Sequence, residues 1–81
     1  MRLSSFMPSE PLTGKPRIIL TGNEALLIEQ HRGVISYTQD RLIVRLRQGR
    51  LNVLGQAMQL QEYGKQDLCV NGEIISLEFV P

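Results

Sequence analysis

The chain has 81 residues and a formal net charge of +1, a size that fits one domain with one core and excludes a multidomain enzyme. Hydrophobic residues make up 42% and charged residues 21%, which are ordinary globular proportions and exclude a disordered tail or a membrane-embedded chain. With 9 Lys and Arg against 8 Asp and Glu, no overall basic field attracts polyanions, so nonspecific nucleic-acid binding is not expected.

The residues 1–16 differ in composition from the rest of the chain. Pro8, Pro11 and Pro16 stand there among Ser, Thr and Gly, a mixture that breaks helices and marks loops. Residues 1–16 are therefore predicted to form an extended or disordered arm, and residues 17–81 a single β domain. Because the start of the chain has no continuous apolar stretch, neither export nor direct membrane insertion is expected.

From Arg17 onward, short runs of β-branched and aliphatic residues alternate with Gly, Asn, Asp or Gln, which is typical of successive short strands. The expected strands cover residues 17–20, 25–29, 34–37, 42–47, 50–54, 57–61, 66–70 and 73–79. Their close, regular spacing predicts an all-β fold, a small antiparallel β-sandwich whose neighbours are mostly sequential. A short β-solenoid and a small barrel are the alternatives.

The clearest local pattern lies in residues 42–54. Leu42, Val44 and Leu46 alternate with polar or outward positions at the period of two that a half-buried strand requires. If Gln48-Gly49 is a two-residue hairpin loop, Leu46 lies opposite Leu51 and Val44 opposite Val53. The same register places Arg45 opposite Asn52 and Ile43 opposite Leu54.

A second hairpin is predicted at Asn71-Gly72, because both residues tolerate a positive φ. This turn sets Leu68 opposite Ile75, with Leu77 and Phe79 continuing the inward face. Tight connections are also expected at residues 32–33, 38–40 and 55–56.

Candidates for chemistry are few. His31, the single histidine, has no Ser or Cys nucleophile at a recognisable spacing and is interpreted as a turn residue. Cys69 cannot form an internal disulfide, which fits a reducing cytoplasmic compartment, and it is interpreted as a plain strand thiol. One Cys and one His cannot complete a zinc site, and no glycine-rich phosphate loop is present. No catalytic residue, metal or cofactor is expected, and the protein is predicted not to be an enzyme.

One basic cluster is expected on the outward side of the predicted hairpin, formed by Arg41, Arg45, Arg47 and Arg50. It surrounds two outward aliphatic side chains, Ile43 and Leu54. An apolar centre bordered by arginines is typical of a protein interface, so these six residues are the candidate interface. A solvated sheet face is the plain alternative, and an RNA-binding β-barrel that uses the arginines is the alternative function.

Four segments together resemble the YabP/YqfC sporulation protein family, and its YqfC branch in particular. They are PRIILTG at residues 16–22, LIEQHRGVISY at 27–37, GRLNVLG at 49–55 and LCVNGEI at 68–74. The resemblance covers about residues 16–79, and its motifs are glycines and aliphatic residues whose order carries the specificity. Two positions depart from the family pattern, Gln30 and Gln56.

The resemblance implies a β-sandwich and a non-enzymatic protein of endospore-forming bacteria. Such a protein is expected in the mother cell during sporulation, where it contributes to formation of the spore envelope or coat. The YqfC branch is further expected to act with a membrane-bound sporulation partner, which suggests an adaptor recruited to the forespore membrane. Self-association is a further possibility, because small cores favour it.

Overall fold

The computed structural model describes residues 15–81, and all of its regular elements there are β-strands. The strands are β1 (Arg17–Thr21), β2 (Ala25–Glu29), β3 (Val34–Tyr37), β4 (Arg41–Arg45), β5 (Arg50–Tyr63) and β6 (Asp67–Val80). They form one six-stranded antiparallel sheet in the order β1-β2-β6-β5-β4-β3. The all-β antiparallel prediction is therefore confirmed. The predicted arm lies outside the described residues, except for Lys15 and Pro16 in front of β1.

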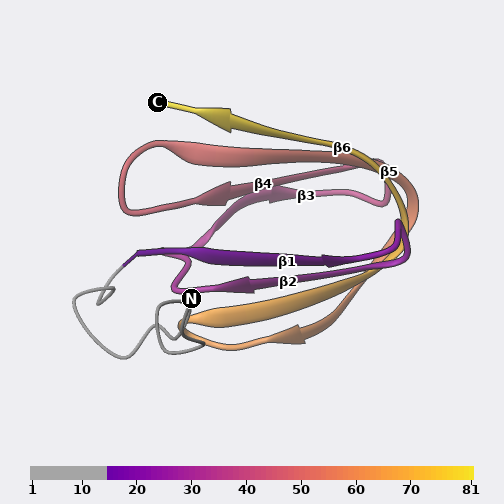
Figure 1. The fold of residues 1–81 in the computed structure, drawn as a ribbon, viewed down its shortest axis with the longest axis horizontal. Coiled ribbons are helices and arrows are strands. Elements are labelled where there is room, and N and C mark those ends of the chain that lie inside the picture. Colours follow the sequence, from indigo (N-terminus) through magenta and orange to yellow (C-terminus); the bar gives the residue numbers. More distant parts are fainter. Residues whose placement is uncertain (1–14) are drawn as a thin grey trace, which may run out of the picture.

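The sheet bends back on itself, so that its two halves face each other as layers (Figure 1). One half contains β1, β2 and the parts of β5 and β6 that adjoin their connection, and the other contains β3, β4 and the remaining parts of the two long strands. Both halves contribute to one aliphatic core. Its members are Leu26, Ile28, Leu42, Val44, Leu46, Leu51, Val53, Met58, Leu68, Val70 and Ile74.

The bend runs through the middle of β5 and β6, where the pairing register shifts at Leu54/Gly55 and again between Gln56 and Gln59. Gly72 adopts a φ of +142°, and a Cβ atom there would lie 2.7 Å from the Cα atom of Met58. A side chain at this position would therefore collide with the opposite strand, and only glycine fits.

This bend corrects two predictions. Asn71-Gly72 is not a hairpin turn, because both residues lie inside β6, and Leu68 pairs with Ile28 and Tyr63 rather than with Ile75. Residues 55–56 likewise lie inside β5 instead of joining two strands. The eight expected strands are thus six, since the last four runs merge into two strands of 14 residues each.

The β4–β5 hairpin has the predicted faces but a different register. Val44 lies opposite Leu51 and Arg45 opposite Arg50, a shift of two residues from the expected pairing. The loop is therefore longer than Gln48-Gly49, and it closes with the Leu46 N–H donating to the Gly49 carbonyl at 3.0 Å. Since the shift is even, every side chain keeps its predicted face.

Two of the predicted connections are confirmed, and both alternative folds are wrong. The connections at residues 32–33 and 38–40 are confirmed between β2 and β3 and between β3 and β4. The solenoid alternative is wrong because all the strand pairs are antiparallel, and the barrel alternative is wrong because the sheet has two free ends, β1 and β3. Residues 15–81 contain no helix that could cross a membrane.

Candidate functional site

The outer face of β4 and β5 carries the interface residues expected from the sequence. Ile43 is half-buried and lies opposite Asn52, while Leu54 is 41% exposed and lies opposite Arg41. Ile43 and Leu54 are consequently diagonal neighbours rather than the directly opposed pair that was predicted. Diagonal side chains on one sheet face are still within reach of each other, so a small apolar patch can form.

Asn52 adds a polar feature to the same face. Its Oδ1 atom is buried and has no hydrogen-bond partner among residues 15–81. A buried acceptor without a donor costs free energy, so Asn52 is a locally unfavourable position on this face.

The predicted basic cluster is divided by the observed register. Arg45 and Arg50 lie directly opposite each other, whereas Arg41 lies at the far end of β4 beside Leu54. Arg32, from the β2–β3 connection, joins the first pair instead. A cavity of about 470 Å³ is lined by Arg32, Ile35, Arg45, Leu46, Arg47, Gly49, Arg50 and Pro81, and we call it the arginine pocket. Sequence reasoning missed Arg32 because nothing in its local sequence places it beside β4.

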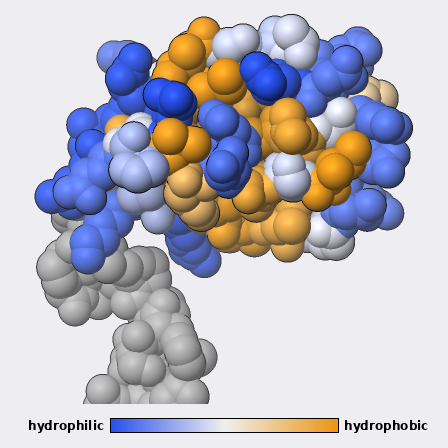
Figure 2. Space-filling model, turned by 90° about the horizontal axis from the view of Figure 1, so that it is seen from above, coloured by the Kyte–Doolittle hydropathy of each residue, from blue (hydrophilic) through white to orange (hydrophobic). Residues whose placement is uncertain are grey.

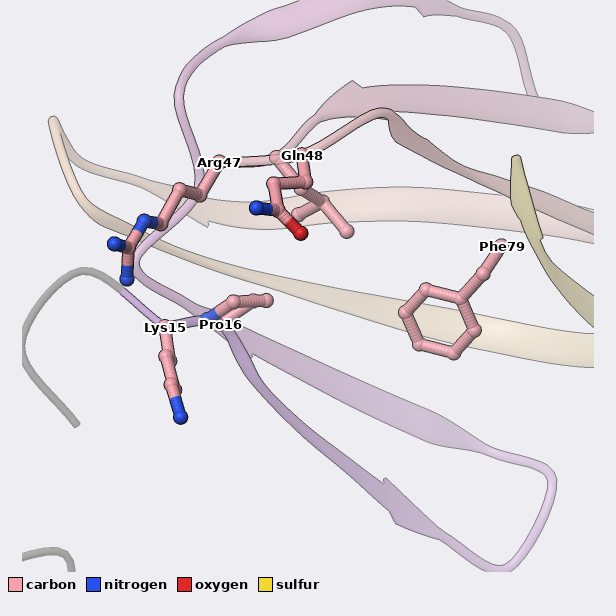
Figure 3. Close-up of a pocket in the computed structure, with 6 residues that line it drawn as sticks. Lys15, Pro16, Arg47, Gln48 and Phe79 are labelled. Carbon is pink, nitrogen blue, oxygen red and sulfur yellow. The ribbon is translucent and has the colours of Figure 1, made fainter. Parts of the chain in front are cut away.

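A second cavity, of about 410 Å³, opens beside the arginine pocket and shares Arg47 and Leu46 with it. Lys15, Pro16 and Gln48 complete one side, and Phe79 from β6 forms the other, its ring directed into the space between them (Figure 3). One wall of this cavity is therefore apolar, formed by Phe79, and the other carries two cationic side chains, Lys15 before β1 and Arg47 in the β4–β5 loop.

One side of β6 is an open sheet edge. β2 pairs with β6 only over Asp67–Asn71, and the Ile74 N–H donates to the Asn23 carbonyl in the β1–β2 turn at 2.8 Å. Beyond that bond, residues 76–80 pair with β5 on one side, and Ile75 is the extra residue at a register shift. On the other side, residues 75–80 pair with no strand of the described chain. We call residues 75–80 the β6 edge.

The β6 edge also exposes apolar side chains. Ile75 is 58% and Phe79 62% exposed, and Leu77 between them is half-buried against the core. Phe79 lies opposite Leu51 and Leu77 opposite Val53, so both are on the side of the sheet that faces the core. The predicted inward position is confirmed for Leu77, which packs against the core, but Phe79 stays exposed. Figure 2 views the molecule from the side on which the end of β6 lies uppermost in Figure 1, and a broad hydrophobic patch occupies much of that surface. Exposed apolar patches of this kind mark interaction sites.

His31 lies in the connection between β2 and β3, as the turn interpretation expected, and it is buried. Its side chain is 3% exposed, and its Nδ1 accepts the Gly33 N–H at 2.9 Å. Nε2 then carries the proton and donates to the Gly64 carbonyl, also at 2.9 Å, while the ring stacks on Tyr63 with centroids 5.6 Å apart. Both ring nitrogens are thus engaged in tying the β2–β3 connection to the β5–β6 turn.

Cys69 lies half-buried in β6, with its Sγ 3.9 Å from Oδ1 of Asn71. Within residues 15–81, no three His, Cys, Asp or Glu side chains gather closely enough to hold a metal ion.

Comparisons with known proteins identify the family of the chain. The profile of the YabP family matches residues 13–81. The protein YqfC of Bacillus subtilis (strain 168), itself named as uncharacterized, is 23% identical over 74 residues, which cover 91% of this chain and 80% of that protein. No solved structure matches. Since the profile spans every described strand, the chain belongs to the YabP family.

Proposed function

We propose that the protein is a non-enzymatic sporulation adaptor that binds a strand of another protein at the β6 edge. Membership of the YabP family, together with the similarity to YqfC, supports a role in spore formation. The single observation that carries the binding mode is the open edge of residues 75–80 with Ile75 and Phe79 exposed beside it.

An open edge suits a strand because its unpaired N–H and C=O groups hydrogen-bond to an extended segment regardless of sequence. Specificity then comes from side chains that fit the exposed apolar positions. The partner is a membrane-bound sporulation protein with an extended, apolar segment, and the adaptor contributes to assembly of the spore envelope or coat. In this scheme the adaptor acts from the cytoplasm of the mother cell at the forespore membrane.

The two end strands of the sheet, β3 and β1, are less suited to docking than β6. β3 is an edge of four residues with a register irregularity, and its Tyr37 hydroxyl donates to the Met58 carbonyl and accepts the Leu60 N–H. β1 has five residues and an ion pair from Arg17 to Glu29 at its start. Short edges, irregular pairing and charged ends are features that discourage strand addition.

The test compares two double variants of the tagged full-length chain in a sporulating host that lacks its own copy. Ile75→Ser with Phe79→Ser removes the apolar positions of the β6 edge, while Ile43→Ser with Leu54→Ser removes those of the outer β4–β5 face. Because Leu54, Ile75 and Phe79 are exposed, and the half-buried Ile43 lies on the outer face and not among the core residues, both proteins are expected to accumulate normally.

The edge variant should lose co-purification of a membrane protein and lower the yield of heat-resistant spores. The face variant is the matched control and should retain both. If only the face variant fails, the partner contacts Ile43 and Leu54, the interface expected from the sequence. If both proteins are abundant and functional, the adaptor proposal is wrong for either surface.

A further inference from the structure

A pair of like charges faces each other across β4 and β5. Arg45 and Arg50 are register partners with side chains on the same outer face. The Cβ atoms of directly opposed residues in an antiparallel pair lie about 4.5–5.5 Å apart, and like charges on two such residues are destabilising. Repulsion between the two arginines therefore lowers the stability of the isolated chain, and an anion between the two guanidinium groups would remove this repulsion.

A third arginine is held beside this pair by the backbone. The Arg32 N–H donates to the Arg45 carbonyl at 2.8 Å, and the Arg45 N–H donates to the Gly33 carbonyl at 2.8 Å. These two bonds fix the β2–β3 connection against the end of β4. Arg32 consequently lines the same cavity as Arg45 and Arg50, although it comes from a different segment of the chain.

Within residues 15–81, no carboxylate side chain forms an ion pair with Arg32, Arg45 or Arg50. The lining of the arginine pocket contains no Asp or Glu, and the ion pair formed within residues 15–81 joins Arg17 to Glu29 at 3.7 Å. Three of the chain's 9 Lys and Arg residues therefore line one cavity that has no acidic residue in its lining, although the net charge of the whole chain is only +1. Such a concentration attracts a local anion.

We infer that the arginine pocket binds a ligand through a phosphate group. Guanidinium groups present planar forks of N–H donors that match pairs of phosphate oxygens. Three such groups around one cavity can donate hydrogen bonds to all the oxygens of a phosphate group, whereas a carboxylate has only two oxygens to accept them. The cavity of about 470 Å³ accommodates a phosphate group together with part of the molecule that carries it. Both a dissolved phosphate ester and the headgroup of an anionic phospholipid have this chemistry.

The experiment measures binding of two phosphate sources to the purified full-length chain. Calorimetry with pyrophosphate at fixed ionic strength reports the dissolved source, with acetate as the anion control. Co-sedimentation with phosphatidylcholine vesicles, with or without phosphatidylglycerol, reports the lipid source. Binding in one arm identifies the source, and absence of binding in both arms overturns the inference.

Two variants locate the site. Arg45→Gln with Arg50→Gln removes the opposed pair and should weaken binding about tenfold or more, because each removes charge-assisted hydrogen bonds. Arg41→Gln, on the same face at the far end of β4, is the matched control and should leave affinity within about twofold because surface charges that distant are screened.

The melting temperature of the ligand-free protein is a second measurement, because it reports the repulsion between Arg45 and Arg50 independently of binding. Arg50→Gln should melt at or above the wild-type temperature, because it relieves repulsion from Arg45. Equal loss of binding in the Arg41 control, or acetate binding as tightly as pyrophosphate, would show nonspecific attraction and overturn the inference. A lower melting temperature for Arg50→Gln would show that the opposed arginines already stabilise each other through other contacts, and would also overturn it.

Discussion

Replacing His31 with Ala tests whether this side chain is a structural clamp. The change removes two hydrogen bonds, to the Gly33 N–H and the Gly64 carbonyl, and the ring contact with Tyr63. Each hydrogen bond contributes about 1 kcal/mol, and a stacked ring pair contributes about 0.5–1.5 kcal/mol. Together the loss is about 3 kcal/mol of the free energy of unfolding, a large share for so small a domain.

In a domain of this size, 1 kcal/mol shifts the melting temperature by roughly 4–8 °C, so His31→Ala should lower it by roughly 12–24 °C. Urea unfolding followed by circular dichroism gives the free energy directly. Tyr63→Phe is the matched control, since it keeps the ring at an exposed position and should change stability by less than about 0.5 kcal/mol.

The reasoning is refuted if His31→Ala costs less than about 1 kcal/mol, the value of one ordinary hydrogen bond. Should His31→Ala fail to fold, Tyr63→Ala still tests the clamp, because it removes only the ring contact and should cost about 1 kcal/mol. A folded, abundant His31→Ala protein that nevertheless fails to support sporulation would reopen a ligand-binding role for the imidazole.

Two further predictions follow from the bend and from the β4–β5 register. Gly72→Val should destabilise the domain by more than about 2 kcal/mol in urea unfolding, because a side chain there meets the opposite strand at a φ that L residues rarely adopt. Gly22→Ala, at a positive φ but in open space, should cost only about 1–2 kcal/mol, and an equal cost at both positions would argue against the close approach. Val44→Asp should abolish the cooperative melt because it buries a carboxylate in the core. Arg45→Asp should raise the melting temperature by pairing with Arg50, and a fall would contradict the observed register.

The faces of the strands could be predicted because they depend only on a period of two. Leu42, Val44 and Leu51 are buried as expected, and Arg45 and Arg50 point outward. The register needed more information, since it depends on how the loop after β4 closes. The Leu46 to Gly49 hydrogen bond makes that loop two residues longer than the expected turn, a difference that alternation alone cannot reveal.

The Asn71-Gly72 signal shows how long-range contacts override local chemistry. The predicted hairpin loop required residues that tolerate a positive φ; Gly72 has a positive φ and Asn71 does not, and the conformation serves a bend inside β6. Pairing of β6 with β5 on one side and β2 on the other provides more hydrogen bonds and burial than a local hairpin could. The merging of short runs into long bent strands therefore depends on partners distant in sequence.

Some residues of the candidate sites could be predicted from the sequence, and others could not. Ile43, Leu54 and the outward arginines of β4 and β5 could be found from local alternation. Arg32 could not, because a backbone hydrogen bond from its N–H to the carbonyl of Arg45, 13 residues further along the chain, places it there. The β6 edge could not either, because a free edge is a property of the strand order of the whole sheet.

Site-specific photo-crosslinking during sporulation tests the docking of a partner strand most directly. A photoreactive residue at Glu78, which lies exposed in the β6 edge opposite Asn52, is compared with one at Arg41, which lies on the same outer face but two strands away on β4. The β6-edge proposal predicts a crosslinked product at position 78 that contains a membrane protein, and little or none at position 41. A membrane-protein product at position 41 alone, or a product at position 78 made of two copies of this chain, would contradict it.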